Sequence, residues 1–347
     1  MAIKKAYYGQ DKDRDYFERV FQSANINFLI GSGASMPAIR VLGNIEDELQ
    51  NFLKNENEQA YFSTASNFLK AVWDANNVLL SRCYEGKEYI ADVKNNVTKT
   101  QDNYKDFFNA LEMILNRRRT GLLPRRINIF TTNYDLFIED AAIKNNTIVL
   151  NDGFSSRANL YNSMQFDARN FYHIIHATGN LYNYSVELPT VNLIKLHGSL
   201  SWEKNKDKIL YSIKSVPPEV FLDKDSEVEW VKSHALILPR KEKFKETLLE
   251  NIYYDLLRMF SNELDKEGTV LFVFGFSFAD EHIEMLTKKA LRNATLKIII
   301  FAYDSISVTL LMDRFRDFSN VELVYSPGGV LDFKKMNEII TCYLGKL

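Results

Sequence analysis

Six short apolar runs dominate the hydrophobic pattern of the chain. They are residues 26–30, 127–130, 191–196, 270–276, 296–303 and 321–325. Small or polar residues follow each of the first four runs at once. Short, mostly apolar runs of this length are typical of strands buried on both faces, as in a parallel sheet between helices. The pattern therefore predicts an α/β fold with a Rossmann-like parallel sheet and helices on both of its faces.

The segments between these runs predict helices. Apolar positions recur at three- and four-residue spacing from about 47 to 119 and again from about 136 to 188. Because both segments are too long to be ordinary crossovers, we expect a helical subdomain, built from insertions, at one end of the sheet. The chain, residues 1–347, is then one discontinuous unit. Its core takes about 20–46, 125–140, 190–200 and 265–347, and its inserts take about 47–124, 141–189 and 201–264.

Charge and cysteine content exclude several classes of protein. Lys and Arg total 43 against 45 Asp and Glu, which gives a formal net charge of −2. No basic surplus is available to replace the counterions of a nucleic acid, so we expect no direct binding of DNA or RNA. The two cysteines, Cys83 and Cys342, are too few for a disulfide framework or a four-cysteine zinc site. A reducing, cytoplasmic compartment fits this composition best.

No membrane segment is expected. The N-terminal residues MAIKKAYYGQDKDRDYF are charged and contain no apolar signal core. The run VLFVF before Gly275 is far shorter than the about 20 residues that span a bilayer.

The first apolar run leads into a glycine-containing segment, GSGAS. Gly31 and Gly33, spaced one apart, allow a tight turn and a close backbone approach to a phosphate. Exposed amides at the start of a following helix would favour an anion. The third glycine of the dinucleotide fingerprint is absent and no Gly-Lys-Ser/Thr follows, so the segment is not a P-loop. A plain strand–helix turn is an equal alternative.

Polar side chains also follow the second run, in TTNYD, at a place where α/β sheets bind ligands. The candidates are Thr132, Asn133 and Asp135. The alternative is a helix N-terminus, with Thr132 or Asn133 as the cap and Asp135 complementing the helix dipole. Taken alone, this motif favours the cap.

The third run ends at His197, which Gly198 follows. A lone histidine is more often structural than catalytic, so this residue by itself decides nothing. His173 and His176 lie three residues apart on a predicted helix and could form a metal pair. No HExxH pattern surrounds them, and we predict no metal site.

The fourth run leads into GFSFADEHI. Gly275 allows close approach of a ligand, and Ser277 offers a hydroxyl group. Asp280 with Glu281 begins a predicted helix, so a capped strand–helix junction is the alternative. Asp304 follows the fifth run in a similar way.

The four motifs together resemble a known family. In chain order they are a glycine turn with a trailing P-x-x-R (Pro37, Arg40), T-x-N-x-D (131–135), L-H-G (196–198) and G-x-S-F-x-D-x-H-I (275–283). This order is similar to that of the sirtuin core. The motifs resemble still more closely those of the sirtuin-like NAD hydrolases of bacterial anti-phage defence, in which the sequences TTNYD, LHGS and GFSFADEHI recur. The resemblance covers about residues 27–304.

The resemblance implies an NAD⁺ pocket at the carboxyl ends of the sheet. Asn133 would orient a water near the ribose, and His197 would be the catalytic histidine. Asp135 would lie beside the nicotinamide amide, and Arg40 in a loop over the nicotinamide ribose. The other residues implied to contact NAD⁺ are Gly31, Ser32, Gly33 and Ala34 at the pyrophosphate, Thr132 in the neighbouring loop, Gly275 and Ser277 at the phosphates or adenosine ribose, and Asp304 at the adenosine end.

Two departures from the sirtuin pattern favour hydrolysis over deacylation. Protein deacylases of this family carry a zinc module with four cysteines, which two cysteines cannot build. Their P-D-F-R wording is replaced here by P-A-I-R at residues 37–40, without the acid and the aromatic side chain. Water is therefore the expected acceptor, and NAD⁺ is the expected substrate, with no zinc or other cofactor.

The resulting hypothesis is an NAD⁺ glycohydrolase, an NAD⁺ nucleosidase that yields nicotinamide and ADP-ribose. Nicotinamide leaves uncharged, so cleavage needs held geometry, a shielded pocket and a placed nucleophile rather than a strong acid. Asn133 can orient a water, and His197 can accept a proton. The alternatives are a zinc-independent protein deacylase or ADP-ribosyltransferase, and a non-catalytic module that senses NAD⁺ or ADP-ribose. Binding alone requires neither Asn133 nor His197, which favours catalysis.

The resemblance also implies a role in defence, as an effector that depletes NAD⁺ in abortive infection. Because an unrestrained NAD⁺ hydrolase is toxic, we expect control through a homo-oligomer or through a separate protein. Relatives pair with a HerA-type ATPase or a short Argonaute, and the HerA-type ATPase suits a stand-alone catalytic chain better.

Overall fold

The computed structural model describes most of the 347 residues. The described ranges are 1–39, 43–81, 91–118, 123–160, 162–178, 185–206, 208–213, 221–236 and 247–342. Arg40 and Cys83, both named from the sequence, lie outside these ranges. Within them, no helix combines the length and the apolar composition that crossing a bilayer requires.

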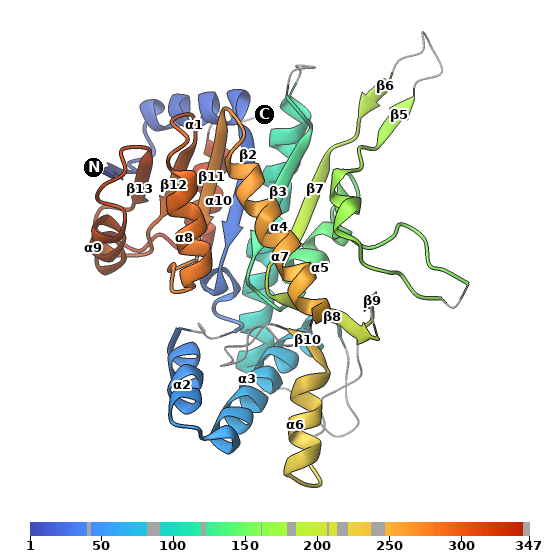
Figure 1. Cartoon of the computed structure of the whole chain (residues 1–347). Helices are drawn as coiled ribbons and strands as arrows, with labels where there is room; N and C mark the ends of the chain where they lie inside the picture. Colours follow the sequence, from blue (N-terminus) through green and yellow to red (C-terminus); the bar gives the residue numbers. More distant parts are fainter. Residues whose placement is uncertain are drawn as a thin grey trace.

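An eight-stranded sheet forms the centre of the fold (Figure 1). In sheet order its strands are β1 (Ile3–Ala6), β13 (Val321–Tyr325), β12 (Lys297–Phe301), β11 (Thr269–Phe274), β2 (Asn25–Ile30), β3 (Arg126–Thr131), β7 (Thr190–Lys195) and β4 (Val149–Asn151). All neighbouring strands in it are parallel. The six strands predicted from the apolar runs are confirmed as β2, β3, β7, β11, β12 and β13. The edge strands β1 and β4, of four and three residues, were not predicted, because such short segments leave no apolar run.

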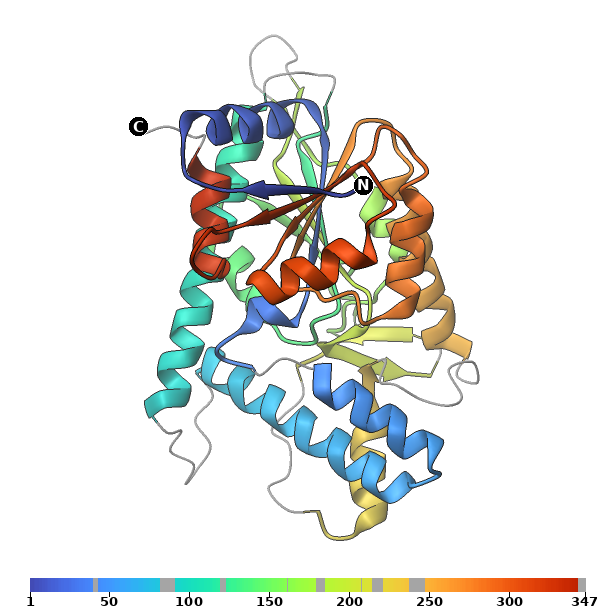
Figure 2. The ribbon, with the colours of Figure 1, turned by 90° about the vertical axis from the view of Figure 1, so that its left-hand side faces the viewer.

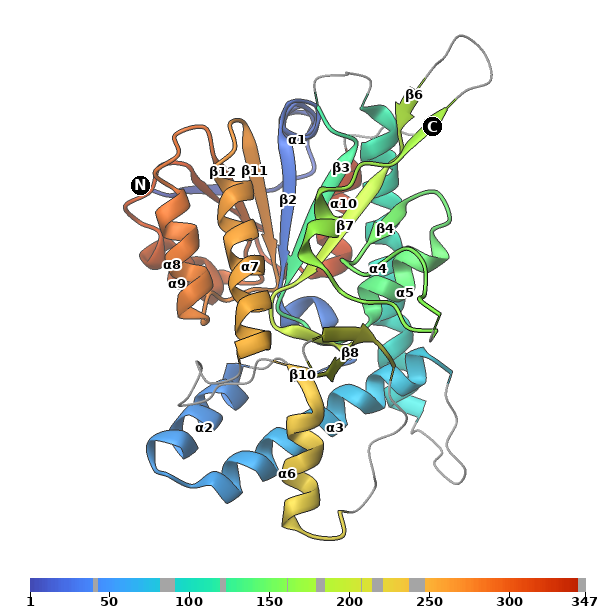
Figure 3. The same ribbon diagram turned by 45° about the vertical axis from the view of Figure 1, so that its right-hand side comes forward.

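Helices cover both faces of this sheet, as Figures 2 and 3 show. One face carries α1 (Asp11–Ser23), α4 (Ala91–Arg117), α5 (Phe137–Lys144) and α10 (Phe333–Thr341). The other carries α7 (Thr247–Leu264), α8 (Glu281–Ala290) and α9 (Ser305–Arg314). The predicted Rossmann-like α/β architecture is confirmed.

Burial on both faces explains why the runs are mostly apolar rather than alternating. Phe28 in β2 packs against Phe107 of α4, with ring centroids 5.1 Å apart. Phe130 in the neighbouring strand β3 packs on the opposite face against Phe260 of α7, at 5.0 Å. Since successive strand residues point to opposite faces, every position of a central strand meets a helix. The central strands are therefore mostly apolar, and the buried polar side chains they do contain, such as Asn27, Asn128 and Asn192, are paired with one another across the strands.

A second layer of elements lies at the carboxyl ends of the central strands (Figure 1). Its helices are α2 (Gly43–Lys54), α3 (Glu58–Leu79) and α6 (Lys224–Ser233), and its small antiparallel sheet has the order β10 (His234–Leu236), β8 (Gly198–Asn205) and β9 (Lys208–Tyr211). Trp73 Nε1 of α3 donates to His234 Nε2 of β10 at 3.0 Å, which joins the helices to this sheet. The division into a core and an insert subdomain at the predicted boundaries stays a prediction, and α4 and α7, inside the predicted inserts, pack on the main sheet.

The helical segment predicted from 136 to 188 is wrong. Beyond α5 this stretch holds the short 3-10 helix η2 (Ala168–Tyr172) and the strands β4, β5 (His176–Thr178) and β6 (Ser185–Glu187). Its many Asn and Asp side chains hydrogen-bond to nearby backbone amides: Asn151 Oδ1 accepts from Gly153 and Asp152 Oδ1 from Phe154, both at 3.2 Å. Such local bonds compete with a helix.

The two histidines of this stretch are consequently not on a helix either. His173 follows η2, and His176 begins β5. Both side chains are exposed.

Candidate active site

The main sheet reverses its strand order between β2 and β11. From β2 the chain proceeds to β3 and β7 on one side, and from β11 to β12 and β13 on the other. At such a point the loops after the two strands part in opposite directions, and α/β sheets bind ligands there. The predicted segments GSGAS and GFSFADEHI follow these two strands.

Three glycines bring these two loops into direct contact. A Cβ on Gly31 would lie 2.4 Å from the Gly275 carbonyl oxygen, and a Cβ on Gly33 would lie 2.8 Å from the Gly275 Cα. Gly275 itself has φ +64°, and a Cβ there would lie 2.5 Å from the Ala34 nitrogen. The Gly31 amide donates to the Phe274 carbonyl oxygen at 3.0 Å, and the Gly33 amide to that of Gly275 at 2.9 Å. The glycines are required for this packing, and their contact with a pyrophosphate stays a prediction.

Gly31→Ala is expected to destabilise the fold by about 1–3 kcal/mol, because the new methyl group meets backbone atoms that cannot rotate away. The same displacement should weaken binding of a nucleotide at this turn. Urea unfolding followed by circular dichroism measures the change. Gly329→Ala is the matched control, since the nearest atom to a Cβ there is Ser326 Oγ, at 3.9 Å. Equal unfolding midpoints for the two variants would contradict the packing argument.

Asn133 is buried just after β3, with 3% of its surface exposed. Its Nδ2 donates to the Gly31 carbonyl oxygen at 3.0 Å and to Ser35 Oγ at 3.1 Å. Its backbone amide donates to Thr131 Oγ1 at 3.1 Å. Its Oδ1 is also buried and has no hydrogen-bond partner among the described residues. An open buried acceptor costs free energy unless a water or a ligand completes it, so Asn133 can orient such a group.

Ser35 ties Asn133 to Asp135. Ser35 is the last residue of the 3-10 helix η1 (Ser32–Ser35), and its Oγ donates to Asp135 Oδ2 at 2.7 Å and lies 3.3 Å from the Tyr104 hydroxyl. Asp135 is 3% exposed. Burial raises the pKa of Tyr104 well above its ordinary value, the Asp135 charge raises it further, and hydrogen bonds with Ser35 and Asn133 oppose the rise. The phenol therefore stays neutral.

The TTNYD loop also fixes the segment that carries His197. The amide of Leu196 donates to the Thr131 carbonyl oxygen at 2.8 Å, and the amide of Leu200 to that of Tyr134 at 3.0 Å. These bonds flank the histidine on both sides. The structure therefore holds His197 beside the loop that contains Asn133.

Gly198 turns the chain directly after the histidine, from β7 into β8. It has φ +86°, and a Cβ there would lie 2.1 Å from the carbonyl oxygen of Ala235 in β10. The glycine of the L-H-G motif thus allows β10 to pack against the turn that carries His197.

His197 faces a carboxylate. Its Nε2 lies 2.9 Å from Asp280 Oδ2, and its surface is 7% exposed. The two atoms do not have the geometry of a hydrogen bond, and they form an ion pair when the imidazole is protonated. Asp280 Oδ1 caps α8, accepting from the amides of His282 and Ile283 at 2.9 and 3.1 Å. The prediction that Asp280 and Glu281 begin a helix is confirmed.

A buried ion pair precedes the histidine on β7. Lys195 Nζ lies 2.9 Å from Glu139 Oε1 and also donates to the Asp135 carbonyl oxygen. Both side chains are almost fully buried. Burial raises the pKa of Glu139, and the Lys195 charge opposes the rise. The pair ties α5 and the TTNYD loop to β7.

Two further predicted residues lie at the ends of neighbouring strands. Ser277 is exposed in the loop after β11. Asp304, after β12, caps α9: its Oδ1 accepts from the amide and the hydroxyl of Ser307, both at 2.8 Å. These bonds hold the pKa of Asp304 below its ordinary value.

The alternative in which Thr132 or Asn133 caps a helix is wrong. Helix α5 begins at Phe137 and has Leu136, not Thr132 or Asn133, at its N-cap position. Thr132 is half-buried. Asp135, by contrast, lies at the start of α5, where its Oδ1 accepts from the Phe137 amide at 3.3 Å. Thr132 and Asn133 therefore have no role as helix caps that would explain them.

Several residues of the site were missed from the sequence. Ser35 and Asp280 lie inside the recognised motifs, and their positions after strands were the available signal. Tyr104 and Glu139 come from α4 and α5, and no pattern in the sequence connects them with the strand ends.

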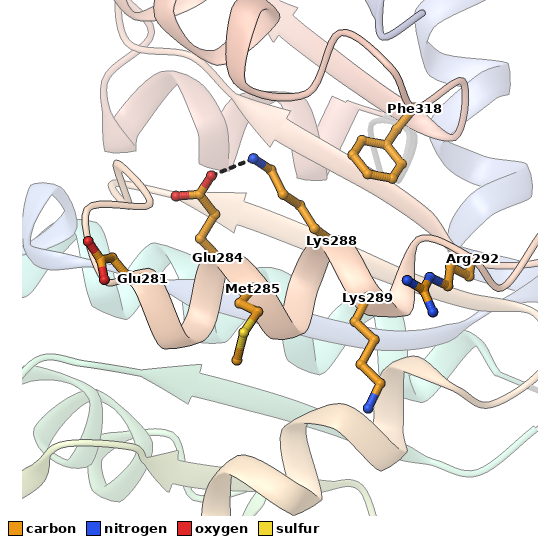
Figure 4. Close-up of a pocket in the computed structure, with 7 residues that line it drawn as sticks. All are labelled: Glu281, Glu284, Met285, Lys288, Lys289, Arg292 and Phe318. Atoms are coloured by element: carbon orange, nitrogen blue, oxygen red, sulfur yellow. Dashed lines mark ion pairs between the residues drawn. The ribbon is translucent and has the colours of Figure 1, made fainter.

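A cavity of about 740 Å³ lies along α8 (Figure 4). It is lined by Glu281, Glu284, Met285, Lys288, Lys289, Arg292 and Phe318. Lys288 Nζ pairs with Glu284 Oε1, one turn away on the same helix, at 2.6 Å. None of the predicted site residues lines it, so we give it no part in the site.

Comparison with known proteins gives one family. The SIR2-like domain family matches residues 127–317, more than half of the chain. No curated protein matches the sequence. Among 44 matching chains of solved structures is a structure of Sir2Tm bound to a propionylated peptide. It aligns over 90% of this chain and 92% of its own, with 14% sequence identity and a TM-score of 0.41.

The chain belongs to the SIR2-like domain family. The matched residues contain the TTNYD loop, His197 and the loop after β11. Membership implies NAD⁺ binding and a sirtuin-type, NAD⁺-using activity.

Proposed function

We propose that the chain is an NAD⁺ glycohydrolase, which cleaves NAD⁺ to nicotinamide and ADP-ribose. The observation that carries this proposal is the buried, open Oδ1 of Asn133, beside the reversal point of the sheet and next to the segment of His197. A buried amide oxygen of this kind can accept a hydrogen bond from a water molecule, whereas an apolar part of a ligand could not satisfy it.

The chemistry needs these two residues and little more. Asn133 orients the water, and His197 accepts its proton. The water oxygen bonds to the ribose carbon, the bond from that carbon to the pyridinium nitrogen breaks, and nicotinamide leaves as a neutral molecule. Because both side chains are buried, their dipoles and charges act on the reacting carbon with little screening.

Water is the proposed acceptor because the chain lacks the cysteines for the zinc module of the protein deacylases. The P-A-I-R wording at 37–40, where deacylases have P-D-F-R, supports the same choice.

Product analysis tests the reaction. The purified chain is incubated with NAD⁺, with and without an acetyl-lysine peptide, and the products are separated by chromatography. We expect nicotinamide and ADP-ribose in equal amounts, unchanged by the peptide. O-acetyl-ADP-ribose, or release that depends on the peptide, would indicate a deacylase instead. NAD⁺ that binds without losing nicotinamide under any condition would indicate a sensor.

We further propose that the enzyme depletes cytoplasmic NAD⁺ in anti-phage defence, under the control of a homo-oligomer or of a partner such as a HerA-type ATPase. The support for this role is the resemblance of the motifs to defence NAD hydrolases. Gel filtration combined with the activity assay tests the control, and a strictly monomeric, fully active chain would contradict it.

A further inference from the structure

The carboxylate beside His197 is held from two sides. Asp280 Oδ2 lies 2.9 Å from His197 Nε2, while Oδ1 accepts from two amides at the start of α8. The side chains of His197 and Asp280 are 8% and 14% exposed. The Asp280 carboxylate is fixed by the start of α8 and also faces a buried imidazole, so capping this helix does not account for all of its contacts.

The loop that carries Asp280 is itself rigidly packed. Phe278 is fully buried. Its backbone has φ +59°, in the left-handed region that bulky residues rarely adopt. Its ring packs against those of Phe276 and Phe315, with centroids 5.0 and 4.9 Å apart. Arg314 of α9 donates to the Phe278 carbonyl oxygen and pairs with Glu284 at 3.0 Å. Backbone strain held in this way is typical of functional loops.

In the part of the chain that the structure describes, few charged or titratable groups face the imidazole. Asp280 faces it from the loop after β11, and Tyr253 faces it from α7, with ring centroids 6.1 Å apart. Burial and the Asp280 charge raise the pKa of Tyr253, so its phenol stays neutral. On β7, which leads into the histidine, Lys195 is paired with Glu139. Among the described residues, Asp280 is therefore the charged partner of the ring.

We propose that Asp280 is a positioning residue for His197, which holds the Nε2 side of the ring and leaves Nδ1 to accept a proton. This inference rests on the proposed NAD⁺ glycohydrolase function. When Nδ1 takes a proton from the attacking water, the ring becomes an imidazolium and the carboxylate stabilises its positive charge. The proton then passes to solvent, and the neutral ring is restored. A carboxylate beside the histidine stabilises the imidazolium in a serine-hydrolase triad as well.

Asp280→Asn removes the negative charge and keeps the helix cap, because Asn caps helices about as well as Asp. We expect kcat for NAD⁺ cleavage to fall about 10- to 100-fold with little change in KM, since the charge is needed after the substrate is bound. Without the carboxylate the imidazolium forms less readily, so the acid limb of the pH–rate profile should move to lower pH. A merely structural role would leave that limb in place.

Asp332→Asn is the matched control. Asp332 caps α10 in the same way, accepting from the Lys335 amide at 2.9 Å, and lies outside the site. We expect its activity and pH profile to match those of the unaltered chain. Wild-type kcat and an unmoved acid limb in Asp280→Asn would overturn the proposal.

A second readout is independent of turnover. The NMR signal of the His197 ring, identified as the one of five histidine signals that is lost in His197→Ala, is followed against pH. Its titration midpoint should fall in Asp280→Asn and stay unchanged in Asp332→Asn. If the chain does not cleave NAD⁺ but the midpoint falls, the proposed function fails and the Asp280–His197 pairing stands. If the midpoint does not move, the pairing itself is wrong.

Discussion

Asn133→Ala is expected to slow nicotinamide release from NAD⁺ by about 10²- to 10⁴-fold, because the variant loses the oxygen that orients the attacking water. The Oδ1 atom is buried and open, while Nδ2 is used by Gly31 and Ser35. Steady-state release of nicotinamide measures the effect. The substitution also removes two hydrogen bonds, so a loss of stability of about 1–3 kcal/mol accompanies it.

Asn128→Ala is the control that distinguishes a loss of catalytic rate from a loss of stability. Asn128 is another buried asparagine, within β3. Its side chain also makes two hydrogen bonds: Nδ2 donates to Asn27 Oδ1 and Oδ1 accepts from Asn192 Nδ2, both at 2.8 Å. We expect a similar loss of stability and an almost unchanged rate. Equal rates for the Asn128 and Asn133 variants would mean that Asn133 has a structural role alone.

Lys195→Met is expected to lower the free energy of unfolding by about 3–5 kcal/mol, because Glu139 is then left buried without a counter-charge. The lysine also donates to the Asp135 carbonyl oxygen, so the TTNYD loop loses a support at the same time. Urea unfolding at neutral pH measures the change. The double variant Lys195→Met/Glu139→Leu should recover most of the loss, because apolar residues of similar volume replace a buried pair well.

The pH dependence of the Lys195→Met variant follows from the raised pKa of Glu139. A folded-state pKa above the ordinary value of 4.5 means that the folded chain binds the proton more tightly than the unfolded chain. The contribution of Glu139 to stability is then greatest below pH 4.5 and falls as the pH rises through its folded-state pKa. Without Lys195 the fall should be larger and extend to higher pH, whereas the double variant should lack it. A pH-independent difference between the single and double variants would contradict this account.

The strands were predictable because the sheet is covered on both faces. Strands such as β2 and β11 pack against helices on both faces, which leaves mostly apolar runs in the sequence. The segment from 136 to 188 was not predictable from spacing, because its apolar residues fall by chance at helical intervals. Local hydrogen bonds of side chains such as Asn151 and Asp152 decide its backbone instead.

Part of the candidate site was predictable for a related reason. Asn133 and His197 each follow a strand, and parallel strands end at the same edge, so chain order alone brings them to one region. The Asp280–His197 contact was not predictable, because β2 and β3 lie between β11 and β7 in the sheet. The loop after β11 crosses the ends of these two strands, and contacts of Phe278 and Arg314 fix its path. No short-range pattern in the sequence predicts that path.

The measurement that tests the central claim most directly is the initial rate of nicotinamide release from NAD⁺ by the unaltered chain, His197→Ala and Asn128→Ala, all shown to be folded. We predict that the unaltered chain and Asn128→Ala release nicotinamide at similar rates and that His197→Ala is slower by at least about 100-fold. Release by His197→Ala at the rate of the unaltered chain would contradict the assignment of the site. Binding of NAD⁺ by the unaltered chain without any release would contradict the hydrolase itself.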